Sequence, residues 1–579
     1  MKYTNLRINI FLVLVLLVSS LIVYRLFILS VVRHSSYFRT AQAQSESINN
    51  VLARGNIYFS DNGSDTILAA TNKKFPLAHI VPDQISSSDK EKAADSLSQI
   101  FSIDHEELRK KINSESSSLR VVARRISNKQ LEAVKSLNIK GVGVSYETDR
   151  LYPGGEIGAS VIGFLGYNAE GSRAGQYGVE EYYENDLLGK QPGLKGLFAL
   201  SDPFGAVNFI KSVTSHQSDK DPEPEFDRPM DIVLTIDKNV QNFIEDRLKD
   251  LFKKWEIEKG TIIVQEPDTG KILAMANWPS FNPNSYGNAK PEHFLNKSTQ
   301  EVYEPGSSFK PVTMSAGIDL GKITPQTSYE DKGFVNIAGY TIHNFSNRVF
   351  GIQNMTQVLQ NSVNTGTMFA ENLIGDDNFL SYVINMGFGQ KTGIDLPGEV
   401  SGDVANLYSG RKINYLTASF GQGIAVTPLQ LVNAYSIIAN GGKLMRPYIV
   451  DRIIKEGGEE VVTQPELVGI PITEKTAIKL QSMLVSVVDY GFDKARIEGY
   501  DIAGKTGTAQ LPDGQGGYSE NDFIHNFVGF APAYNAKFVI LIKMDKPRGI
   551  QFAADSLSPV FKEVAAFLIN YYNIPPTRK

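Results

Sequence analysis

The 579-residue sequence contains no cysteine, and this absence excludes several kinds of chemistry. Without thiols the chain can form neither disulfides nor thiolate metal sites, and it has no cysteine nucleophile. Its seven histidines are scattered, with no pair four residues apart, so the sequence indicates neither a histidine-based metal site nor a Ser-His-Asp triad. Nothing in the sequence calls for a metal or another cofactor.

A strong charge of either sign is also missing. The chain has 58 Lys and Arg against 63 Asp and Glu, a net charge of −5. A nucleic-acid partner would normally leave a basic footprint, so none is expected. Hydrophobic residues make up 42% of the chain, which excludes disorder as a general description. The length exceeds what one compact core accommodates, so we expect two or more domains.

One long hydrophobic run stands at the amino terminus. Residues 8–24 (INIFLVLVLLVSSLIVY) carry no charge, and the apolar character resumes after Arg25 through residue 32. Together these residues are long enough to cross a bilayer, with the Arg25 side chain reaching the far interface. The alternative is a cleaved signal peptide. The run is long for a signal peptide and no small-residue cleavage pattern follows it, which favours an uncleaved single-pass anchor within residues 1–35.

The orientation of this anchor is not fixed by charge. Lys2 and Arg7 precede the span, whereas Arg25, Arg33 and Arg39 lie within or after it. The short leader favours a cytoplasmic amino terminus. The rest of the chain would then lie outside the cytoplasmic membrane.

The remainder divides into two regions. Residues 36–225 are mixed and rather polar, with helices expected at 88–101, 105–113 and 128–137 and strands at 119–123 and 140–145. The polar, proline-bearing segment 213–229 predicts a boundary or a long surface loop. We therefore divide the chain into an anchor (1–35), a non-catalytic pedestal (36–225) and a catalytic domain (226–579).

The catalytic region has the pattern of a sheet flanked by helices. Strands are expected at 232–236, 261–265, 272–276, 500–503, 526–530 and 537–544, and helices at 241–253, 559–569 and within 308–440. Strands at both ends of the region, with helices between them, predict an α+β domain.

Ser307 and Lys310 form the first chemical motif, within the sequence Glu304-Pro-Gly-Ser-Ser-Phe-Lys-Pro. Three residues apart on a helix, they share one face. Pro311 is tolerated only in the first turn, so Ser307 should lie near a helix N-terminus, where backbone N–H groups favour developing negative charge. A desolvated lysine has a depressed pKa and can take the proton of the serine, so this pair is a nucleophile that needs no histidine.

A second motif, Ser362-Val-Asn364, falls in an expected helix at 356–373. A hydroxyl and an amide two residues apart can pass on a proton and hold a substrate amide. The third motif, Lys505-Thr506-Gly507-Thr508, follows the expected strand at 500–503. Its glycine would let a substrate backbone approach closely, while the lysine and threonines could bind a carboxylate.

Each triplet also occurs elsewhere in the chain. The additional copies are Ser87-Ser-Asp-Lys90, Ser60-Asp-Asn62 and Lys391-Thr-Gly393. They lie in a polar serine run, a turn and a glycine-rich connection, respectively. The three motifs appear in order with helix, helix and strand contexts only at Ser307, Ser362 and Lys505.

This combination resembles the penicillin-binding proteins and serine β-lactamases, and the neighbouring sequence resembles class B penicillin-binding proteins. The matching segments of the catalytic region are 234–237, 266–284, 303–311, 419–435, 439–442, 503–510 and 527–533. Segments 53–63, 150–155 and 177–189 resemble that family's pedestal. One departure is Tyr58-Phe59, where the family usually has an acidic residue.

The resemblance implies a role for each motif residue. Ser307 would attack the penultimate D-alanine carbonyl of a peptidoglycan stem peptide, with Lys310 as general base. Ser362 would relay protons, and Asn364 would bind the acyl-side amide. The roles implied for the third motif are carboxylate binding by Lys505, Thr506 and Thr508, and substrate binding by Gly507 between the two threonines. The backbone N–H groups of Ser307 and Thr508 would form an oxyanion hole. β-Lactams would acylate the same serine.

Several alternatives share these motifs. A class A enzyme would need a glycosyltransferase domain that residues 36–225 cannot supply, and a β-lactamase would need a deacylating base that is not evident. A D,D-carboxypeptidase stays open, as does a scaffold that activates a polytopic glycosyltransferase. The resemblance implies such a glycosyltransferase and other division proteins as partners. The form of segment 303–311 and the short tail favour septal over elongation synthesis.

Overall fold

The computed structural model describes residues 19–20, 54–63, 65–114, 119–169, 171–189, 229–337, 339–491, 493–512 and 517–578. The predicted anchor, apart from Ser19 and Ser20, and the predicted boundary at 213–229, apart from Pro229, lie outside these ranges. Within them, no helix has the length and apolar character needed to cross a bilayer. The chain divides into two compact units, Met1–Ala53 with Asn72–Arg150, and Arg54–Thr71 with Leu151–Lys579.

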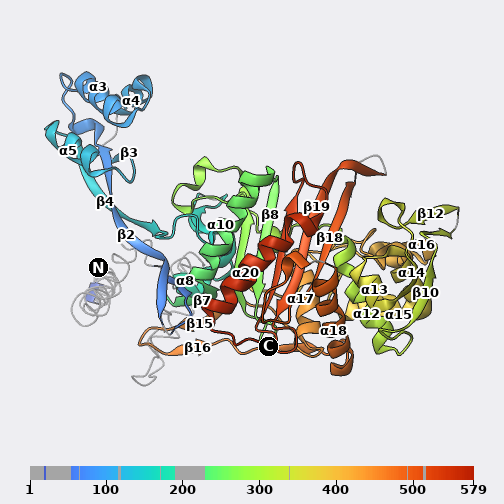
Figure 1. Ribbon diagram of the computed structural model, residues 1–579. Helices are drawn as coiled ribbons and strands as arrows, with labels where there is room; N and C mark the ends of the chain where they lie inside the picture. Colours follow the sequence, from blue (N-terminus) through green and yellow to red (C-terminus); the bar gives the residue numbers. More distant parts are fainter. Residues whose placement is uncertain are drawn as a thin grey trace, which may run out of the picture. The chain divides into compact units, whose positions relative to one another are not determined.

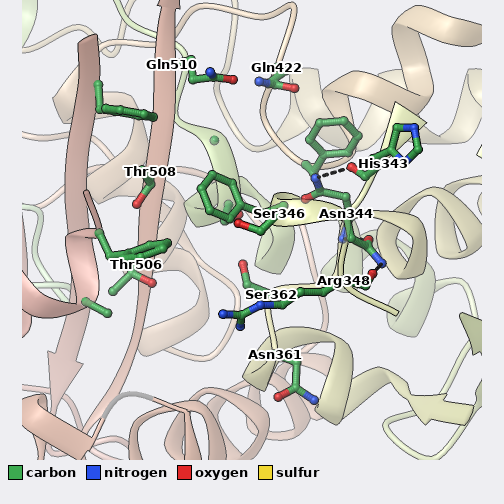
Figure 2. A pocket seen from close by; sticks show the side chains of 18 of the residues that line it. His343, Asn344, Ser346, Arg348, Asn361, Ser362, Gln422, Thr506, Thr508 and Gln510 are labelled. Atoms are coloured by element: carbon green, nitrogen blue, oxygen red, sulfur yellow. Dashed lines mark hydrogen bonds between the residues drawn. The ribbon is translucent and has the colours of Figure 1, made fainter. Parts of the chain in front are cut away.

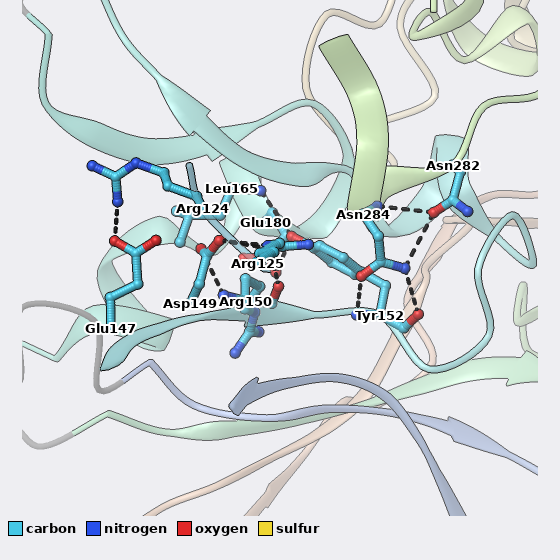
Figure 3. A network of polar contacts seen from close by, with 10 residues as sticks. All are labelled: Arg124, Arg125, Glu147, Asp149, Arg150, Tyr152, Leu165, Glu180, Asn282 and Asn284. Atoms are coloured by element: carbon cyan, nitrogen blue, oxygen red, sulfur yellow. Dashed lines mark hydrogen bonds and ion pairs between the residues drawn. The ribbon is translucent and has the colours of Figure 1, made fainter. Parts of the chain in front are cut away.

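In its described residues, the smaller unit packs three α-helices against three strands. Its elements are the outer part of β2 (Thr66–Ile80), α3 (Lys90–Phe101), α4 (His105–Ile112), β3 (Arg120–Ala123), α5 (Asn128–Ser136) and β4 (Val142–Leu151). Both β3 and β4 pair with β2. The predicted helices and strands are confirmed. Strand β4 continues six residues beyond its predicted end, because pairing with β2 holds the polar residues that follow in an extended conformation. Arg125 pairs with Asp149 at 2.7 Å in this unit (Figure 3).

The larger unit is built on a five-stranded antiparallel sheet. Its order is β18 (Ala503–Pro512), β19 (Tyr518–Ala531), β20 (Phe538–Asp545), β8 (Lys259–Gln265) and β9 (Ile272–Trp278). Alternate residues of β20 enter opposite cores, so both faces of the sheet are covered. Helices α10 (Lys238–Trp255) and α20 (Ser558–Tyr571) cover one face (Figure 1). Helix α17 (Pro428–Ala439) packs against the other, and α18 (Glu474–Tyr490) contacts β18 and α17. The predicted α+β class is confirmed.

A helical lobe adjoins the edge strand β18. It contains α12 (Lys310–Asp319), α13 (Met355–Gln360), α14 (Asn364–Ile374), α15 (Asp376–Asn385) and α16 (Lys412–Ala418). Two small antiparallel sheets accompany these helices, β10 (Ser328–Asp331) with β13 (Gly351–Asn354), and β11 (Phe334–Ile337) with β12 (Tyr340–His343).

A second sheet of the larger unit joins its early and late segments. The order is β16 (Glu460–Val462), β15 (Val450–Ile454), β7 (Asp231–Asp237), β1 (Ile57–Ser60) and the first part of β2, with β1 and β7 parallel. The atypical Tyr58 lies in β1, and its hydroxyl donates to Asp231 at 3.4 Å.

The three pedestal-like segments meet in a buried polar cluster of this unit. Arg54 Nε donates to a carboxylate oxygen of Glu180 at 2.6 Å, and Tyr152 donates to the same carboxylate at 3.1 Å. The backbone of Tyr152 also pairs with Asn284 (Figure 3). Arg54, Tyr152 and Glu180 are all buried, and the opposite charges of Arg54 and Glu180 are paired inside the fold.

Two predictions near the motifs are wrong. The strand predicted at 500–503 begins only at Ala503 and continues to Pro512, because the ladder with β19 overrides the low strand propensity of Gly504 and Gly507. The helix predicted at 356–373 is broken between α13 and α14. Ser362 adopts φ +55° at the break, a conformation that ends a helix.

Candidate active site

Ser307 lies where a tight turn leads into α12. A single 3₁₀ turn, Gly306–Phe309, precedes α12, and Pro311 occupies the first turn of that helix as predicted. Gly306 has φ +57°, and a Cβ there would lie 3.2 Å from the Thr508 carbonyl oxygen. Glycine therefore permits both the turn and its close packing on β18, which leaves Ser307 half-buried at the cleft surface.

Lys310 is completely buried one turn after Ser307. Its Nζ donates to the Ser362 carbonyl oxygen at 2.5 Å, to Asn364 Oδ1 at 2.8 Å and to Ser362 Oγ at 3.3 Å. Burial, reinforced by the nearby positive charge of Lys505, lowers the pKa of Lys310 well below its ordinary value. Among the contacts of the described residues, no hydrogen bond joins Lys310 to Ser307 Oγ; such bonds often tighten only once substrate is bound.

The second motif forms the corner between α13 and α14. Because Ser362 is in the left-handed region, both its carbonyl and its hydroxyl reach Lys310. Asn364 is the first residue of α14, and its Nδ2 donates to the His343 carbonyl oxygen at 3.3 Å. The broken helix therefore aims backbone and side-chain acceptors together at one ammonium group, which a continuous helix could not do.

The third motif brings a second buried lysine to the same corner. Lys505 Nζ donates to Ser362 Oγ and to the Thr506 carbonyl oxygen, each at 3.0 Å. Burial lowers the pKa of Lys505 to about 7. Two lysines from different motifs thus share the Ser362 hydroxyl, and burial lowers the pKa of each below its ordinary value.

Gly507 serves a purpose that its sequence context did not suggest. A Cβ at this position would lie 2.5 Å from the Pro305 carbonyl oxygen and 2.6 Å from the Asn526 side chain. The protein chain just before Ser307, rather than a substrate, occupies the space that this glycine opens. Thr506 and Thr508 flank it, and both line the cleft.

The motifs surround one open cleft of about 490 Å³ (Figure 2). Ser307, Ser362, Asn364, Thr506 and Thr508 all line it, whereas Lys310 and Lys505 lie beneath its surface. Aromatic side chains and the segment 343–350 complete its walls. The structure therefore brings together every residue that the sequence analysis placed in the site.

Glu304 supports the turn from outside the cleft. Its carboxylate accepts from the Gly423 backbone N–H at 3.0 Å and from the Tyr518 hydroxyl at 3.1 Å. Burial raises its pKa, which these hydrogen bonds partly oppose. Glu304 thus ties the Ser307 turn to β19 and to the loop after α16.

The additional copies of the motifs lie elsewhere. Ser60 ends β1 and Lys90 begins α3, while Thr392 donates to Glu399 in a connection between helices. Sequence reasoning missed Asp331, Asn344 and Arg348, which border or support the cleft. They are isolated polar residues in a stretch without a recognisable motif, so only the fold shows their position.

One group of described side chains has the geometry of metal ligands. Ligand atoms of Glu91, Asp95 and His105 lie within 4.8 Å of one another in the smaller unit. His105 already pairs with Asp95 at 3.0 Å, and both acids are exposed. We assign no metal to this surface group, and no Asp or Glu is among the described residues that line the cleft.

Two family models match the chain. Residues 260–566 match the penicillin-binding protein transpeptidase domain, and residues 50–195 match the penicillin-binding protein dimerisation domain. The stage V sporulation protein D of Bacillus subtilis is 33% identical over 500 residues, covering 85% of this chain and 74% of that protein. The peptidoglycan D,D-transpeptidase FtsI homolog of Mesostigma viride is 28% identical over 587 residues, covering 96% and 94%.

Solved structures show the same architecture. Penicillin-binding protein 3 of Mycobacterium tuberculosis, in a complex with aztreonam, superposes with a TM-score of 0.64 at 27% identity, covering 74% of this chain and 92% of that one. Penicillin-binding protein 2X of Streptococcus thermophilus superposes with a TM-score of 0.69 at 21% identity, covering 90% of this chain and 80% of that one. This match shows a likeness of fold. The family models, the relatives and the fold agree, and the chain belongs to the class B penicillin-binding proteins.

Proposed function

We propose that this protein is a peptidoglycan D,D-transpeptidase that cross-links stem peptides through an acyl-enzyme on Ser307. The observation that carries the proposal is the meeting of Lys310 and Lys505 at the Ser362 hydroxyl, directly beneath the cleft that Ser307 lines. A buried network of two lysines with depressed pKa values can move protons at neutral pH without a histidine.

Acylation begins with proton transfer. Neutral Lys310 takes the Ser307 hydroxyl proton as Oγ attacks the penultimate D-alanine carbonyl. Backbone N–H groups of Ser307 and Thr508 would stabilise the oxyanion, a contribution of about 3 kcal/mol per donor. The C–N bond to the terminal D-alanine then breaks, and the leaving amine receives a proton through Ser362. Asn364 would hold the acyl-side amide, and Thr506 and Thr508 would form the carboxylate end of the site, with Gly507 between them and Lys505 beneath.

The second half-reaction forms the cross-link. An amino group of a neighbouring stem peptide attacks the acyl carbon, loses a proton to the same lysine network, and releases Ser307 with its hydroxyl restored. A β-lactam would acylate Ser307 in the same manner. Its ring-opened leaving group stays attached, which blocks the approach of the amine.

The proposal extends to the cellular setting. We propose an amino-terminal anchor within residues 1–35, a pedestal over 36–225 and a catalytic domain over 226–579 outside the cytoplasmic membrane. The apolar run at 8–24 supports the anchor. A septal role with a polytopic glycosyltransferase and division proteins as partners follows the class B relatives, among them the FtsI homolog.

Gel labelling with a fluorescent penicillin tests the nucleophile. The parent protein is compared with Ser307→Ala and with Ser87→Ala, which removes the serine of the additional Ser-x-x-Lys sequence. Label that persists for minutes and disappears only in Ser307→Ala supports the proposal. Rapid loss of label with drug hydrolysis would indicate a β-lactamase, and folded protein without label would indicate a scaffold.

A second assay separates cross-linking from hydrolysis. A D-alanyl thioester donor is supplied with and without an amino-acid acceptor, and the products are identified by mass spectrometry. Transfer to the acceptor in preference to water supports a transpeptidase. Hydrolysis that no acceptor suppresses would indicate a carboxypeptidase.

A further inference from the structure

The segment from the end of β12 to the start of β13 forms one wall of the cleft, and buried hydrogen bonds hold its backbone in place. We call residues 343–350 the cleft strap. Asn344 Nδ2 donates to the Arg348 carbonyl oxygen at 3.1 Å and to both carboxylate oxygens of Asp331 at 3.0 Å. Asp331 also accepts from the Phe350 backbone N–H at 2.8 Å. The backbone around Arg348 is therefore fixed at both ends by buried groups.

Arg348 gives the cleft its charge. Among the described residues that line the cleft, it is the one side chain with a permanent charge, and none is acidic. It is exposed, and it makes no ion pair with any acidic residue that the structure describes. The exposed Arg446, by contrast, pairs with Glu466 at 3.0 Å.

The buried lysines do not duplicate this charge. Lys310 and Lys505 are fully shielded from solvent, and their Nζ atoms donate hydrogen bonds to Ser362, Asn364 and Thr506. A substrate that enters the cleft meets the guanidinium of Arg348 directly. In Figure 2 this side chain runs past Ser362 toward the strand that carries Thr506.

We propose that Arg348 is a specificity-determining residue that binds a carboxylate of the stem peptide. The inference rests on the proposed transpeptidase function. A guanidinium presents parallel N–H donors that match a carboxylate, and a rigid backbone lowers the entropy lost on binding. The carboxylate is either the terminal one, at the leaving D-alanine, or one on the acyl side of the scissile bond.

Three thioester probes distinguish these two sources. Benzoyl-D-alanyl-mercaptoacetate carries a carboxylate at the leaving end, and benzoyl-D-alanyl-mercaptoacetamide is its neutral counterpart. Succinyl-D-alanyl-mercaptoacetamide carries a carboxylate on the acyl side. Release of thiol is followed with a chromogenic disulfide, and the protein adds no background because it has no cysteine.

The expected result is a selective loss. Arg348→Gln should lower kcat/KM about 10- to 100-fold for one of the two charged probes and leave the neutral probe within about twofold. Loss with mercaptoacetate identifies the terminal carboxylate, and loss with the succinyl probe identifies the acyl-side group. Arg348→Lys should recover part of the loss, since it keeps the charge without the paired donors.

The control is Arg411→Gln, which removes an exposed arginine of the same unit that does not line the cleft. It should leave all three rates unchanged. Equal rates for parent and Arg348→Gln on every probe, or an equal loss on all three, would overturn this inference and leave the transpeptidase proposal in place. A parent that releases thiol from none of the probes would overturn the transpeptidase proposal, and the inference with it.

Discussion

The Nζ of Lys505 lies 3.0 Å from the Oγ of Ser362, so the strand motif and the loop motif meet at one hydroxyl. Lys310 approaches the same oxygen at 3.3 Å from the helix that follows Ser307. A hydroxyl between two amines can accept a proton from one while donating to the other. Ser362 is thereby placed to connect the base of the first half-reaction to the leaving group.

Substitution of Ser362 separates its chemistry from its backbone conformation. Ser362→Ala and Ser362→Gly both remove the hydroxyl, and each should slow acylation by penicillin about 10²- to 10⁴-fold. At φ +55° alanine is strained by about 1 kcal/mol, whereas glycine is not. The glycine variant should therefore melt at the higher temperature of the two. Stopped-flow labelling and thermal unfolding measure the two effects, and a glycine variant as fast as the parent would contradict the relay.

The pH dependence of acylation should report the depressed pKa of Lys310. Only the neutral amine can take the Ser307 proton, so the rate should fall as pH decreases through the folded pKa of Lys310. Burial lowers that pKa well below the ordinary 10.5, so the rate should reach its plateau long before that pH. Rates of penicillin acylation between pH 5 and 10 test this, with Lys310→Arg expected to be inactive throughout. A rate that climbs steadily to pH 10 would disagree with a buried base.

The stability of the protein should carry the signature of buried Lys505. Its pKa is about 7 when folded against an ordinary 10.5, so between these values only the unfolded chain binds the proton. The free energy of unfolding of the parent, relative to Lys505→Met, should thus rise with pH from about 7 to 10.5, at up to about 1.4 kcal/mol per unit. Below pH 7 the difference should stay constant. Urea unfolding at several pH values measures it, and Lys322→Met, which removes an exposed lysine, should show no such trend.

Much of the fold was predictable because its patterns are local. Strands β8 and β9 were predicted from two apolar runs separated by a Pro-Asp-Thr-Gly turn, and they pair as expected. The helix around Pro311 was predicted from the restricted position of proline. In each case the residues that determine the structure are neighbours in the sequence.

The chemical motifs were predictable as a set, but their geometry was not. The break at Ser362 depends on Lys310, more than 50 residues away, which satisfies the carbonyl that a continuous helix would use. The space at Gly507 is filled by Pro305, on another element. Asp331 and Asn344 carry no motif because their function is to hold one segment of backbone. Such relationships are set by tertiary packing, which a single sequence does not display.

Asp331 provides the last prediction because it anchors both the cleft strap and the corner of the second motif. Its carboxylate accepts from Asn344, Phe350, Gly333 and Thr365, while Asn344 Oδ1 accepts from the first backbone N–H of α14. Burial opposes ionisation, yet these hydrogen bonds bring the pKa of Asp331 below its usual value. The stability that the ionised Asp331 carboxylate contributes to the fold is therefore present above about pH 4 and is lost as pH falls.

Asp331→Asn should accordingly destabilise the folded protein by about 1.5–3 kcal/mol at neutral pH, with the difference from the parent shrinking in acid. It should also weaken the discrimination between charged and neutral thioester probes, because the backbone of Arg348 loses its support. Thermal unfolding from pH 3 to 7 and the probe rates measure both effects. Glu330→Gln, an exposed change on the preceding residue of the same strand, should alter neither. Full stability with normal discrimination in Asp331→Asn would show that the strap is held by other contacts.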